Sequence, residues 1–544
     1  MSEHAPSAVG SISLCLSGGG YRAIAFHLGT LSYLDHVGLR EDIRQLSTVS
    51  GGTFVGAKYV LSLMEGVGFN DFFRDYWRFL ETTDLTGMGF DALDGPIPDT
   101  SSGRHHVIAC MARVYAETFM KDPEGHPYLF GQVLDADLPF DEVVFNATEL
   151  RHGEVFRFQR STNADAIIGT DRVRISRGDA AKIRMADIVA ASSCFPGGFE
   201  PLAFPDDFVW PKHEIPAGLR SQFSREGVPA PVLLVDGCVA DNPGIQSLLL
   251  SNRHDPGRQG MFIISDVDPH VDELYGYLAA GKLGGPTLER LVLYARILLT
   301  VWLLSVAGLG AFIWTQTGGD GRQFSDVLLS AMPVLLAGMV AGAIFWVNRT
   351  IKKLVIKSIP TVGPILWGHL MKTRLHQFLD MMRLRFTSVL KVSEKVYPTR
   401  IRTLVYELLD TDPAYRKKYV TNVLHELASG QPWPPELVGV VPQPSPALRQ
   451  VVDFAETVPI TLWFDNREQL PCLVATGQAD MCFNLLVWLV RNHGADPGAH
   501  SPGIRALWDR LVADWQTLNA NPYALLETFL PGQRLARLDP AAAR

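Results

Sequence analysis

Twice within the first part of the chain, a strand-like segment ends in a glycine turn and a helical segment follows. Residues 11–16 (SISLCL) predict a buried strand, and the turn at 17–20 leads into the helical pattern of 21–37. Residues 45–49 predict a second strand, and the turn that starts at Ser50 again precedes a helix. Strand, glycine turn and helix in repetition are typical of an α/β fold with a mainly parallel sheet.

The rest of the chain divides into segments of different pattern. Further strands are predicted at 142–146, 155–159, 232–235 and 261–265. Residues 201–231 are rich in proline and predict a surface loop, residues 365–428 look largely helical, and residues 460–476 return to strand-like and turn-like sequence. In 502–516 the apolar residues fall on one helix face, with Ser501 as the cap and Pro502 at the first helical position.

Composition limits the classes of function. The chain has 544 residues, too many for one ordinary core, and 47% of them are apolar. A net charge of −8 without a basic stripe argues against nucleic-acid binding. The six cysteines include no CxxC pair, so zinc and redox motifs are absent. The start, MSEHAPSAVG, has no basic patch before an apolar run, so we expect no secretory signal and a cytosolic catalytic part.

Two long apolar runs interrupt this soluble pattern. Ile297–Trp314 is 18 residues without a formal charge and Val327–Val347 is 21, with a polar segment of 12 residues between them. At 1.5 Å per residue they reach roughly 27 and 32 Å, against a bilayer core of roughly 30 Å. They predict a transmembrane helical hairpin, although a pair of buried core helices or a re-entrant hairpin would share this pattern.

The charges beside the runs predict their orientation. Seven cations lie outside the hairpin, namely Lys282, Arg290, Arg296, Arg349, Lys352, Lys353 and Lys357, and one, Arg322, lies in its loop. The positive-inside rule then places both termini and the catalytic part in the cytoplasm, in an integral membrane protein. Small residues four apart, at Gly338 and Gly342 and at Ala307 and Ala311, suit either the packing of the hairpin itself or a homo-oligomer.

Ser50 is the first candidate for chemistry. A nucleophilic serine needs a sharp strand-to-helix turn with small neighbours, hence the usual G-x-S-x-G. The segment here is Thr48-Val49-Ser50-Gly51-Gly52, so both following glycines are present and Thr48 replaces the first one. A serine before two glycines also suits a helix cap, so Ser50 alone leaves both interpretations open.

The glycine run Ser17-Gly18-Gly19-Gly20-x-Arg22 adds a second feature. Consecutive glycines after a buried strand can aim several backbone N–H groups at one point, at the positive end of a helix. Negative charge that develops on a tetrahedral intermediate needs such donors. The competing interpretation, a phosphate-binding loop, lacks both GxxxxGK[ST] and GxGxxG with its acidic partner.

Asp236 is the third feature. It follows the apolar strand VLLV and begins the segment Asp236-Gly237-Cys238-Val239-Ala240-Asp241-Asn242-Pro243. Open α/β sheets place their sites at the carboxyl ends of strands, which is where this carboxylate is predicted to lie. A lone aspartate there is usually a turn former, but the following glycine and Asn-Pro indicate a special loop.

Together these features resemble the patatin-like phospholipase family. The order is GGGxR, serine turn and Asp-Gly, and two further stretches agree: Asn146-Ala-Thr148 ahead of Gly153, and Ala191-Ser-Ser-Cys-Phe-Pro196 with Phe199 and Pro201. The resemblance covers residues 10–268 and, more weakly, 455–492. It implies a three-layer α/β/α hydrolase, in which the membrane hairpin looks like an insertion before the closing helix.

The resemblance also implies a mechanism. Ser50 would attack a fatty-acyl ester and form an acyl-enzyme, and Asp236 would accept the serine proton and later activate water, without a catalytic histidine, a metal or a cofactor. The amides of Gly18, Gly19, Gly20 and Gly51 would hold the oxyanion, with Arg22 and Gly237 in support. The implied substrates are membrane phospholipids or other acyl glycerolipids, cleaved in the manner of a phospholipase A or a lysophospholipase.

Several alternatives stay open at this point. A Ser-His-Asp esterase could use His254 or His270, which follow Asp236, and the Thr48 replacement permits an inactive membrane scaffold. Residues 84–100 are rich in Gly and Pro and suit a flap or an ordinary surface loop. We expect a catalytic domain at 1–280, the hairpin at 281–358, and at 359–544 a helical region with a C-terminal part that completes the catalytic domain.

Overall fold

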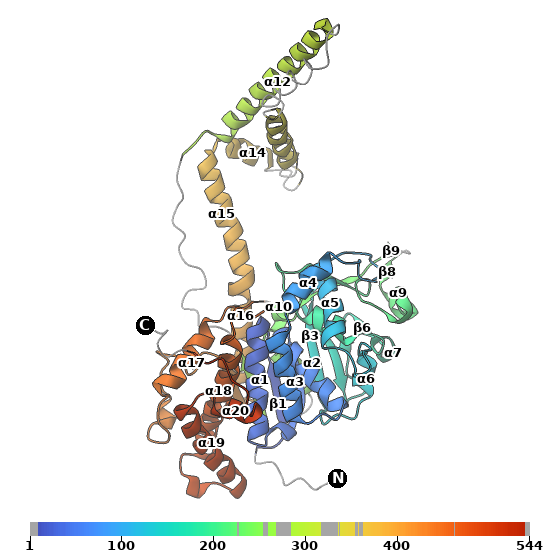
Figure 1. Cartoon of the computed structure of the whole chain (residues 1–544). Coiled ribbons are helices and arrows are strands. Elements are labelled where there is room, and N and C mark those ends of the chain that lie inside the picture. The colour runs from blue at the N-terminus through green and yellow to red at the C-terminus, as the bar shows by residue number, and fades with distance from the viewer. Residues whose placement is uncertain are drawn as a thin grey trace. The chain divides into compact units, whose positions relative to one another are not determined.

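The computed structural model divides the chain into two compact units. One comprises Met1–Asp272 with Tyr397–Arg544, and the other Glu273–Val396. The structure describes residues 9–225, 228–253, 259–267, 284–316, 336, 338–353, 357, 363–461 and 463–538. Figure 1 shows that the first unit joins N-terminal (blue) and C-terminal (red) elements, while α12 and α15 belong to the second unit.

A mixed sheet forms the centre of the first unit. Its strands are β1 (Ile12–Leu16), β2 (Ile43–Val49), β3 (Glu142–Glu149), β4 (Glu154–Ser161), β5 (Ile168–Gly169), β6 (Arg174–Ile175), β7 (Leu202–Phe204), β10 (Val232–Asp236), β11 (Met261–Asp266) and β12 (Tyr419–Val423). The order β12-β11-β1-β2-β3 is parallel throughout, and β4, β5 and β6 extend it in antiparallel fashion. The prediction of an α/β fold with parallel central strands is therefore confirmed.

Alternating side chains of the central strands face two different helical layers. Ile12, Leu14 and Leu16 of β1 belong to a large core that includes α1 (Gly20–His36), α2 (Gly51–Met64) and α18 (Gln469–His493). Cys15, from the same strand, packs instead in a smaller core with residues of α11 (Ile245–Ser251) and α16 (Tyr397–Thr411). Because a strand points successive side chains to opposite faces, the sheet is covered on both sides.

The edge of β3 brings two strand ends together. The first part of β3 pairs in parallel with β2, up to the pair Val49 and Asn146. Beyond this point β10 takes over the same edge in antiparallel fashion, and its last pair is Asp236 with Ala147. The carboxyl ends of β2 and β10 therefore meet at adjacent residues of β3, which places Ser50 next to Asp236.

Helix α18 shows that the expectation for 460–476 was wrong. The apolar letters CLVAT lie within this helix, not in a strand. Within the described residues two helices are long and apolar enough to cross a membrane, and α18 is one of them, but 94% of its apolar 18-residue stretch is buried. The backbones of α18 and α1 approach closely at Gly29, where a Cβ would meet the backbone of Val474 and Gly477. We therefore read α18 as a core helix.

Two further segments differ from their predictions. Within 201–231, predicted as a loop, β7 is buried and pairs with β10, and α9 (Ala217–Gln222) follows. The region 365–428 is helical only as far as Thr411, and β12 then joins the sheet.

Residues 84–100 contain a helix, α4 (Leu85–Leu93), capped by the Asp84 carboxylate. The helix predicted at 502–516 is confirmed, because α19 (Pro502–Ala520) starts at Pro502 and buries the face from Ile504 to Trp515. Ser501 occupies the N-cap position, but its side chain makes no capping hydrogen bond.

The second unit is helical where the structure describes it. Its elements are α12 (Leu288–Gln316), helical residues 338–353, α14 (Gly363–Lys372) and α15 (Leu375–Lys391). The second membrane-length helix is the segment Leu288–Gly308 of α12, only 6% of which is buried. A side chain on Gly338 would collide with Trp302 of α12, which supports packing within the hairpin. Much of the predicted span 327–347 and most of its preceding loop lie outside the described residues.

Candidate active site

Ser50 occupies a strained turn between β2 and α2. Its φ of 50° and ψ of −118° lie outside the regions that L-residues favour, and it is the residue before the first turn of the helix. The Ser50 amide donates to the hydroxyl of Ser192 at 3.0 Å, which holds the turn from the side. Such a turn exposes a hydroxyl at the positive end of a helix, the arrangement that a nucleophilic serine requires.

Close backbone packing explains why the elbow has its glycines where it does. A Cβ on Gly51 would meet the carbonyl of Gly20, and one on Gly52 would meet the carbonyl of Leu16. Thr48, which replaces the usual first glycine, fits because α2 presents Gly56 to its methyl group. The Thr48 hydroxyl also lies 2.9 Å from that of Thr53. The missing glycine on the strand is thus accommodated by a glycine on the helix.

Asp236 receives the hydroxyl of Ser50. Ser50 Oγ donates to Asp236 Oδ2 at 2.7 Å, and the second carboxylate oxygen, Oδ1, accepts the amide of Cys238 at 2.8 Å. Asp236 is 1% exposed, and burial raises the pKa of its carboxyl to about 6, although the Cys238 amide and Ser50 hydroxyl oppose the shift. A carboxylate with this pKa is a stronger proton acceptor than an exposed aspartate.

Two side chains and one backbone contact fix the two strand ends. The hydroxyl of Ser192, in α8 (Met185–Ser192), donates to the Asn146 carbonyl at 2.6 Å in addition to accepting the Ser50 amide. Thr148 Oγ1 donates to the backbone carbonyl of Asp236 at 2.8 Å. The amide of Asp236 donates to the backbone carbonyl of Cys194 at 2.9 Å. The stretches around Asn146 and Ser192, which the sequence marked only by resemblance, are therefore direct neighbours of the dyad.

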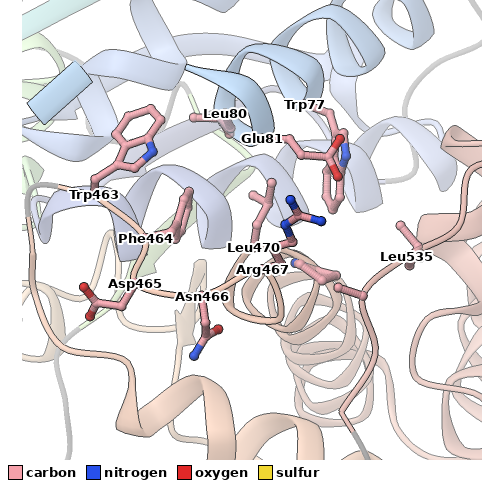
Figure 2. A pocket seen from close by; sticks show the side chains of 12 residues that line it. Trp77, Leu80, Glu81, Trp463, Phe464, Asp465, Asn466, Arg467, Leu470 and Leu535 are labelled. Atoms are coloured by element: carbon pink, nitrogen blue, oxygen red, sulfur yellow. The ribbon is translucent and has the colours of Figure 1, made fainter. Parts of the chain in front are cut away.

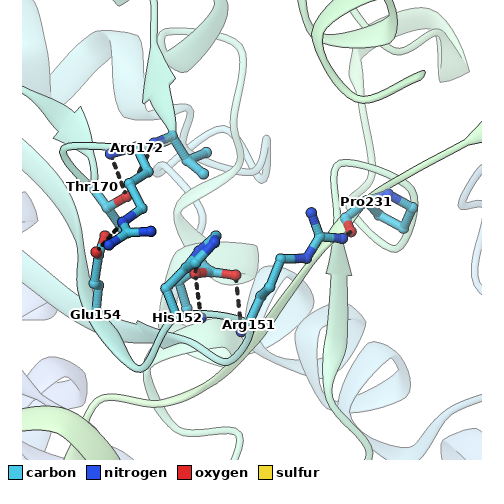
Figure 3. Close-up of polar contacts among 8 residues, drawn as sticks. Arg151, His152, Glu154, Thr170, Arg172 and Pro231 are labelled. Atoms are coloured by element: carbon cyan, nitrogen blue, oxygen red, sulfur yellow. Dashed lines mark hydrogen bonds and ion pairs between the residues drawn. The ribbon is translucent and has the colours of Figure 1, made fainter. Parts of the chain in front are cut away.

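The turn after β3 is held by one buried carboxylate. Glu149 is fully buried and accepts the amides of Arg151 and His152, each at 3.0 Å. Figure 3 shows these contacts and, beside them, the ion pair of Arg172 with Glu154 on β4. Gly153 completes the turn at a φ of 68°, which favours glycine. This hairpin stiffens the strand that carries Asn146 and Thr148.

The glycine run lies beside Ser50. A Cβ on Gly18 would stand 3.1 Å from the Cβ of Ser50, and the amide of Gly18 already donates to the Asn242 carbonyl at 3.1 Å. Gly19, at a φ of 150°, packs against Val267, and Gly20, at 60°, packs against the Thr461 carbonyl. Within the described part of the chain, the amides of Gly19, Gly20 and Gly51 have no acceptor. These three N–H groups are the available donors for an oxyanion.

Arg22 ties the glycine run to its surroundings. The side chain is 2% exposed, and its guanidinium donates to the carbonyls of Val267, at 2.5 Å, and Val458, at 3.0 Å. Val267 is the residue that packs against Gly19, so Arg22 fixes the wall of the glycine run. Gly237, the other predicted supporting residue, allows close contact with the Asn146 carbonyl and Val49.

An open cavity of about 180 Å³ lies near the glycine run. Figure 2 shows that Trp77, Trp463, Phe464 and Arg467 are among its lining residues, and neither Ser50 nor Asp236 is one of them. The Trp463 ring meets that of Tyr21, the residue after Gly20, with 3.8 Å between centroids. Sequence patterns do not reveal this wall, because Tyr21 and Trp463 are far apart in the chain.

Other candidate groups lie away from the dyad or outside the described residues. Asp122, Glu124 and His126 form the one described carboxylate and histidine cluster that could hold a metal, and it is mostly exposed, in the turn before Pro127. Neither His254 nor His270, proposed for a triad, is among the residues that the structure describes.

Comparison with known proteins gives one family. Residues 14–249 match the family model described as Patatin-like phospholipase. This range contains the glycine run, Ser50 and Asp236, and it excludes the second unit. No curated protein matches the chain.

Proposed function

Because residues 14–249 form a patatin-like phospholipase domain, we propose that this chain is a membrane-anchored serine lipid acyl hydrolase working through a Ser50–Asp236 dyad. One observation carries the proposal: the Ser50 hydroxyl, at a strained elbow, donates to the buried Asp236 carboxylate at 2.7 Å. A nucleophile within hydrogen-bond reach of a base with a raised pKa is the arrangement that acyl transfer needs.

In the first half-reaction Ser50 Oγ attacks the carbonyl carbon of a fatty-acyl ester. Its proton passes to Asp236 Oδ2, and the negative charge on the former carbonyl oxygen is met by the amides of Gly19, Gly20 and Gly51. When the tetrahedral intermediate collapses, the ester C–O bond breaks. The leaving glycerolipid alkoxide takes the proton from Asp236, and an acyl-Ser50 ester remains.

In the second half-reaction water replaces the alcohol. Asp236 accepts a proton from the water as its oxygen attacks the acyl carbon, and the same amides hold the oxyanion. Collapse breaks the bond to Ser50 Oγ, which regains its proton from Asp236. The products are a fatty acid and the free enzyme.

The membrane part of the proposal rests on the second unit. Leu288–Gly308 is long enough to span a bilayer, and most of its apolar side chains are not buried against protein within the described residues. A bilayer would cover these side chains, and it also contains acyl glycerolipids, the proposed substrates. We place both termini on the cytoplasmic side, from the seven cations that flank the hairpin.

A fluorophosphonate probe tests the nucleophile. Wild-type protein should be labelled and should hydrolyse a short-chain p-nitrophenyl ester and phospholipid vesicles, and Ser50→Ala should lose all three signals. Ser62→Ala is the matched control, because Ser62 is a buried serine of the same helix that bonds only locally, to Tyr59. Labelling of Ser50→Ala would contradict the assignment, and absence of labelling in folded wild type would favour the inactive scaffold.

The histidine alternative has its own test. The double variant His254→Ala with His270→Ala should keep activity within a few-fold if the dyad suffices. A Ser-His-Asp triad would lose most of it, by about 10⁴-fold or more. The two results are therefore well separated on one soluble ester assay.

A further inference from the structure

A buried histidine lies behind the glycine run. His27 belongs to α1, is fully buried, and its Nε2 lies 2.9 Å from the carbonyl oxygen of Ser17. Because a carbonyl can only accept, Nε2 carries a proton and donates it to this bond. His27 is therefore hydrogen-bonded to the residue that starts the glycine run, although it does not contact Ser50 or Asp236 in the described structure.

The other ring nitrogen fixes the tautomer. Nδ1 lies 2.8 Å from the Ser265 hydroxyl, which is itself 2.9 Å from the Thr30 hydroxyl, and Asn422 donates to Thr30 at 2.8 Å. In a neutral imidazole with hydrogen on Nε2, Nδ1 accepts from Ser265. Burial lowers the pKa of His27 to about 4, so the ring is neutral near pH 7. The ring is thus held by the Ser265 hydroxyl at Nδ1 and by the Ser17 carbonyl at Nε2, while the Thr30 hydroxyl also donates to the Phe26 carbonyl at 3.2 Å.

The peptide between Ser17 and Gly18 is held at both ends. Its carbonyl accepts from His27 and from the Gly52 amide at 3.2 Å, and its N–H donates to the Asn242 carbonyl. The next peptide is held too, because the Ser17 hydroxyl donates to the Gly18 carbonyl at 3.1 Å. In a trans peptide the N–H points opposite to the C=O, so this contact turns the Gly19 N–H away from Ser17 Oγ.

Glycine makes such contacts necessary. Glycines rotate easily on both sides of a peptide, so a run of three can present either N–H groups or carbonyl oxygens to a neighbouring site. A carbonyl turned toward Ser50 would repel the oxyanion that an N–H would stabilise. The bonds at Ser17 select one of these orientations, and His27 is the only side chain among the described residues that donates to the Ser17 carbonyl.

We propose that His27 is a positioning residue for the hydrolase reaction, whose Nε2–H fixes the Ser17–Gly18 peptide and thereby the oxyanion donors of the glycine run. This role rests on the proposed function of Ser50. It gives the chain a histidine that acts through the backbone of the oxyanion site, and it differs from the general base of a triad, which must reach the nucleophile.

Two substitutions of similar polarity separate the ring nitrogens. His27→Gln can place an amide N–H near the position of Nε2, whereas the shorter His27→Asn reaches only the region of Nδ1 and Ser265. We expect His27→Asn and His27→Leu to lower kcat on a soluble ester by about tenfold to a hundredfold, with KM unchanged, because oxyanion contacts act in the transition state. His27→Gln should stay within about threefold of wild type.

The controls make each outcome decisive. Ser32→Ala, on the same buried helix and bonded to Gln478 instead of the glycine run, reports on general loosening of α1 and should keep kcat. Thermal unfolding shows which variants are folded, and if His27→Leu is not, the Gln and Asn pair decides. Equal losses in Gln and Asn, or a wild-type kcat in folded Asn, would overturn the role of His27. If wild type shows no hydrolysis that Ser50→Ala removes, the proposed function fails, and the role of His27 with it.

Discussion

Burial of the Asp236 carboxyl has opposite consequences for reactivity and stability. Its pKa of about 6 makes it a stronger base than an exposed aspartate. The folded state therefore holds this proton more tightly than the unfolded chain, where the ordinary value of 3.8 applies. The group stabilises the fold at low pH, and that contribution is lost as the pH rises from about 4 to about 6. The ionised Asp236 carboxylate therefore makes the fold less stable at neutral pH than at low pH.

We predict a distinctive pH dependence for Asp236→Asn. Wild-type kcat/KM should rise with pH through about 6 and level off above it, because only the carboxylate can accept the serine proton. The variant should lose activity by a factor of about 10³ or more. The melting temperature of the variant, relative to that of wild type at the same pH, should be higher at pH 8 than at pH 5. A flat wild-type profile between pH 5 and 7, or an active variant, would contradict the dyad.

At the same scale, sequence indicates the proposed reacting residues better than their supports. Ser50 and Asp236 could be proposed because each follows a predicted strand and precedes glycine, a local pattern with a physical reason. The hydroxyl of Ser192 and the imidazole of His27 could not be assigned, because their partners are fixed only when distant segments pack together. The sequence offers no spacing rule for such contacts.

At the scale of elements, α18 shows how a buried helix escapes sequence analysis. A helix surrounded by protein needs no polar face, so the amphipathic period that identifies surface helices is absent, and the run CLVAT suggests a strand. Strand β7 was not predicted for another reason: it has only three residues and lies in a proline-rich segment. The central strands β1 and β11 were predictable because nearly continuous apolar runs are typical of parallel sheets, whereas β2 (IRQLSTV) is mostly polar and was marked by the glycine turn after it.

The crossing of α1 and α18 gives a prediction for this element. Gly477→Val should lower the free energy of unfolding by about 3 kcal/mol, because its Cβ would meet the backbone of Phe26 and Thr30. Gly178→Val, in the short helix α7 (Arg177–Ala180) with open space around it, is the control and should change stability little. Chemical denaturation of the two variants in detergent checks this. If Gly477→Val matched wild type, the close packing of α18 on α1 would be wrong.

At the scale of the whole molecule, the proposed chemistry and the proposed membrane anchor lie in different units. Every residue of the candidate site belongs to the first unit, while the exposed apolar helix α12 belongs to the second. The chain leaves the first unit after Asp272 and returns at Tyr397, so the second unit is an insertion between β11 and α16. If the second unit is the proposed membrane tether, it would raise the local concentration of a membrane substrate without altering the reaction centre.

Deleting the second unit should therefore separate the two properties. With Glu273–Val396 replaced by a flexible Gly/Ser linker, we expect a protein that stays in the supernatant after ultracentrifugation. Its kcat on a soluble ester should lie within a few-fold of wild type, and its rate on phospholipid vesicles should fall. Persistent sedimentation with membranes would place the anchor elsewhere, and loss of soluble-ester hydrolysis in a folded deletion protein would assign the second unit a catalytic part.

The last prediction concerns the direction of the hairpin. The two apolar runs of 18 and 21 residues would be unfavourable in water, since roughly 25 cal/mol is lost for each Å² of apolar surface left exposed. A soluble core could bury them, but α12 is almost unburied in its own unit, and a core would not require flanking cations. The bias of seven cations outside to one in the loop then predicts that the loop around Asp320 crosses to the far side.

Single cysteines can test this in intact cells. A membrane-impermeant thiol reagent added from outside should label Gly319→Cys, in the loop, and should label Lys353→Cys, on the exposed flank, only after lysis. Background should be low, because five of the six native cysteines are buried and all six lie in the first unit, on the predicted cytoplasmic side. Labelling of Gly319→Cys only after lysis would mean that the hairpin does not cross, and a re-entrant or buried arrangement would replace it. Labelling of Lys353→Cys in intact cells would invert the orientation and put the proposed hydrolase outside the cytoplasm.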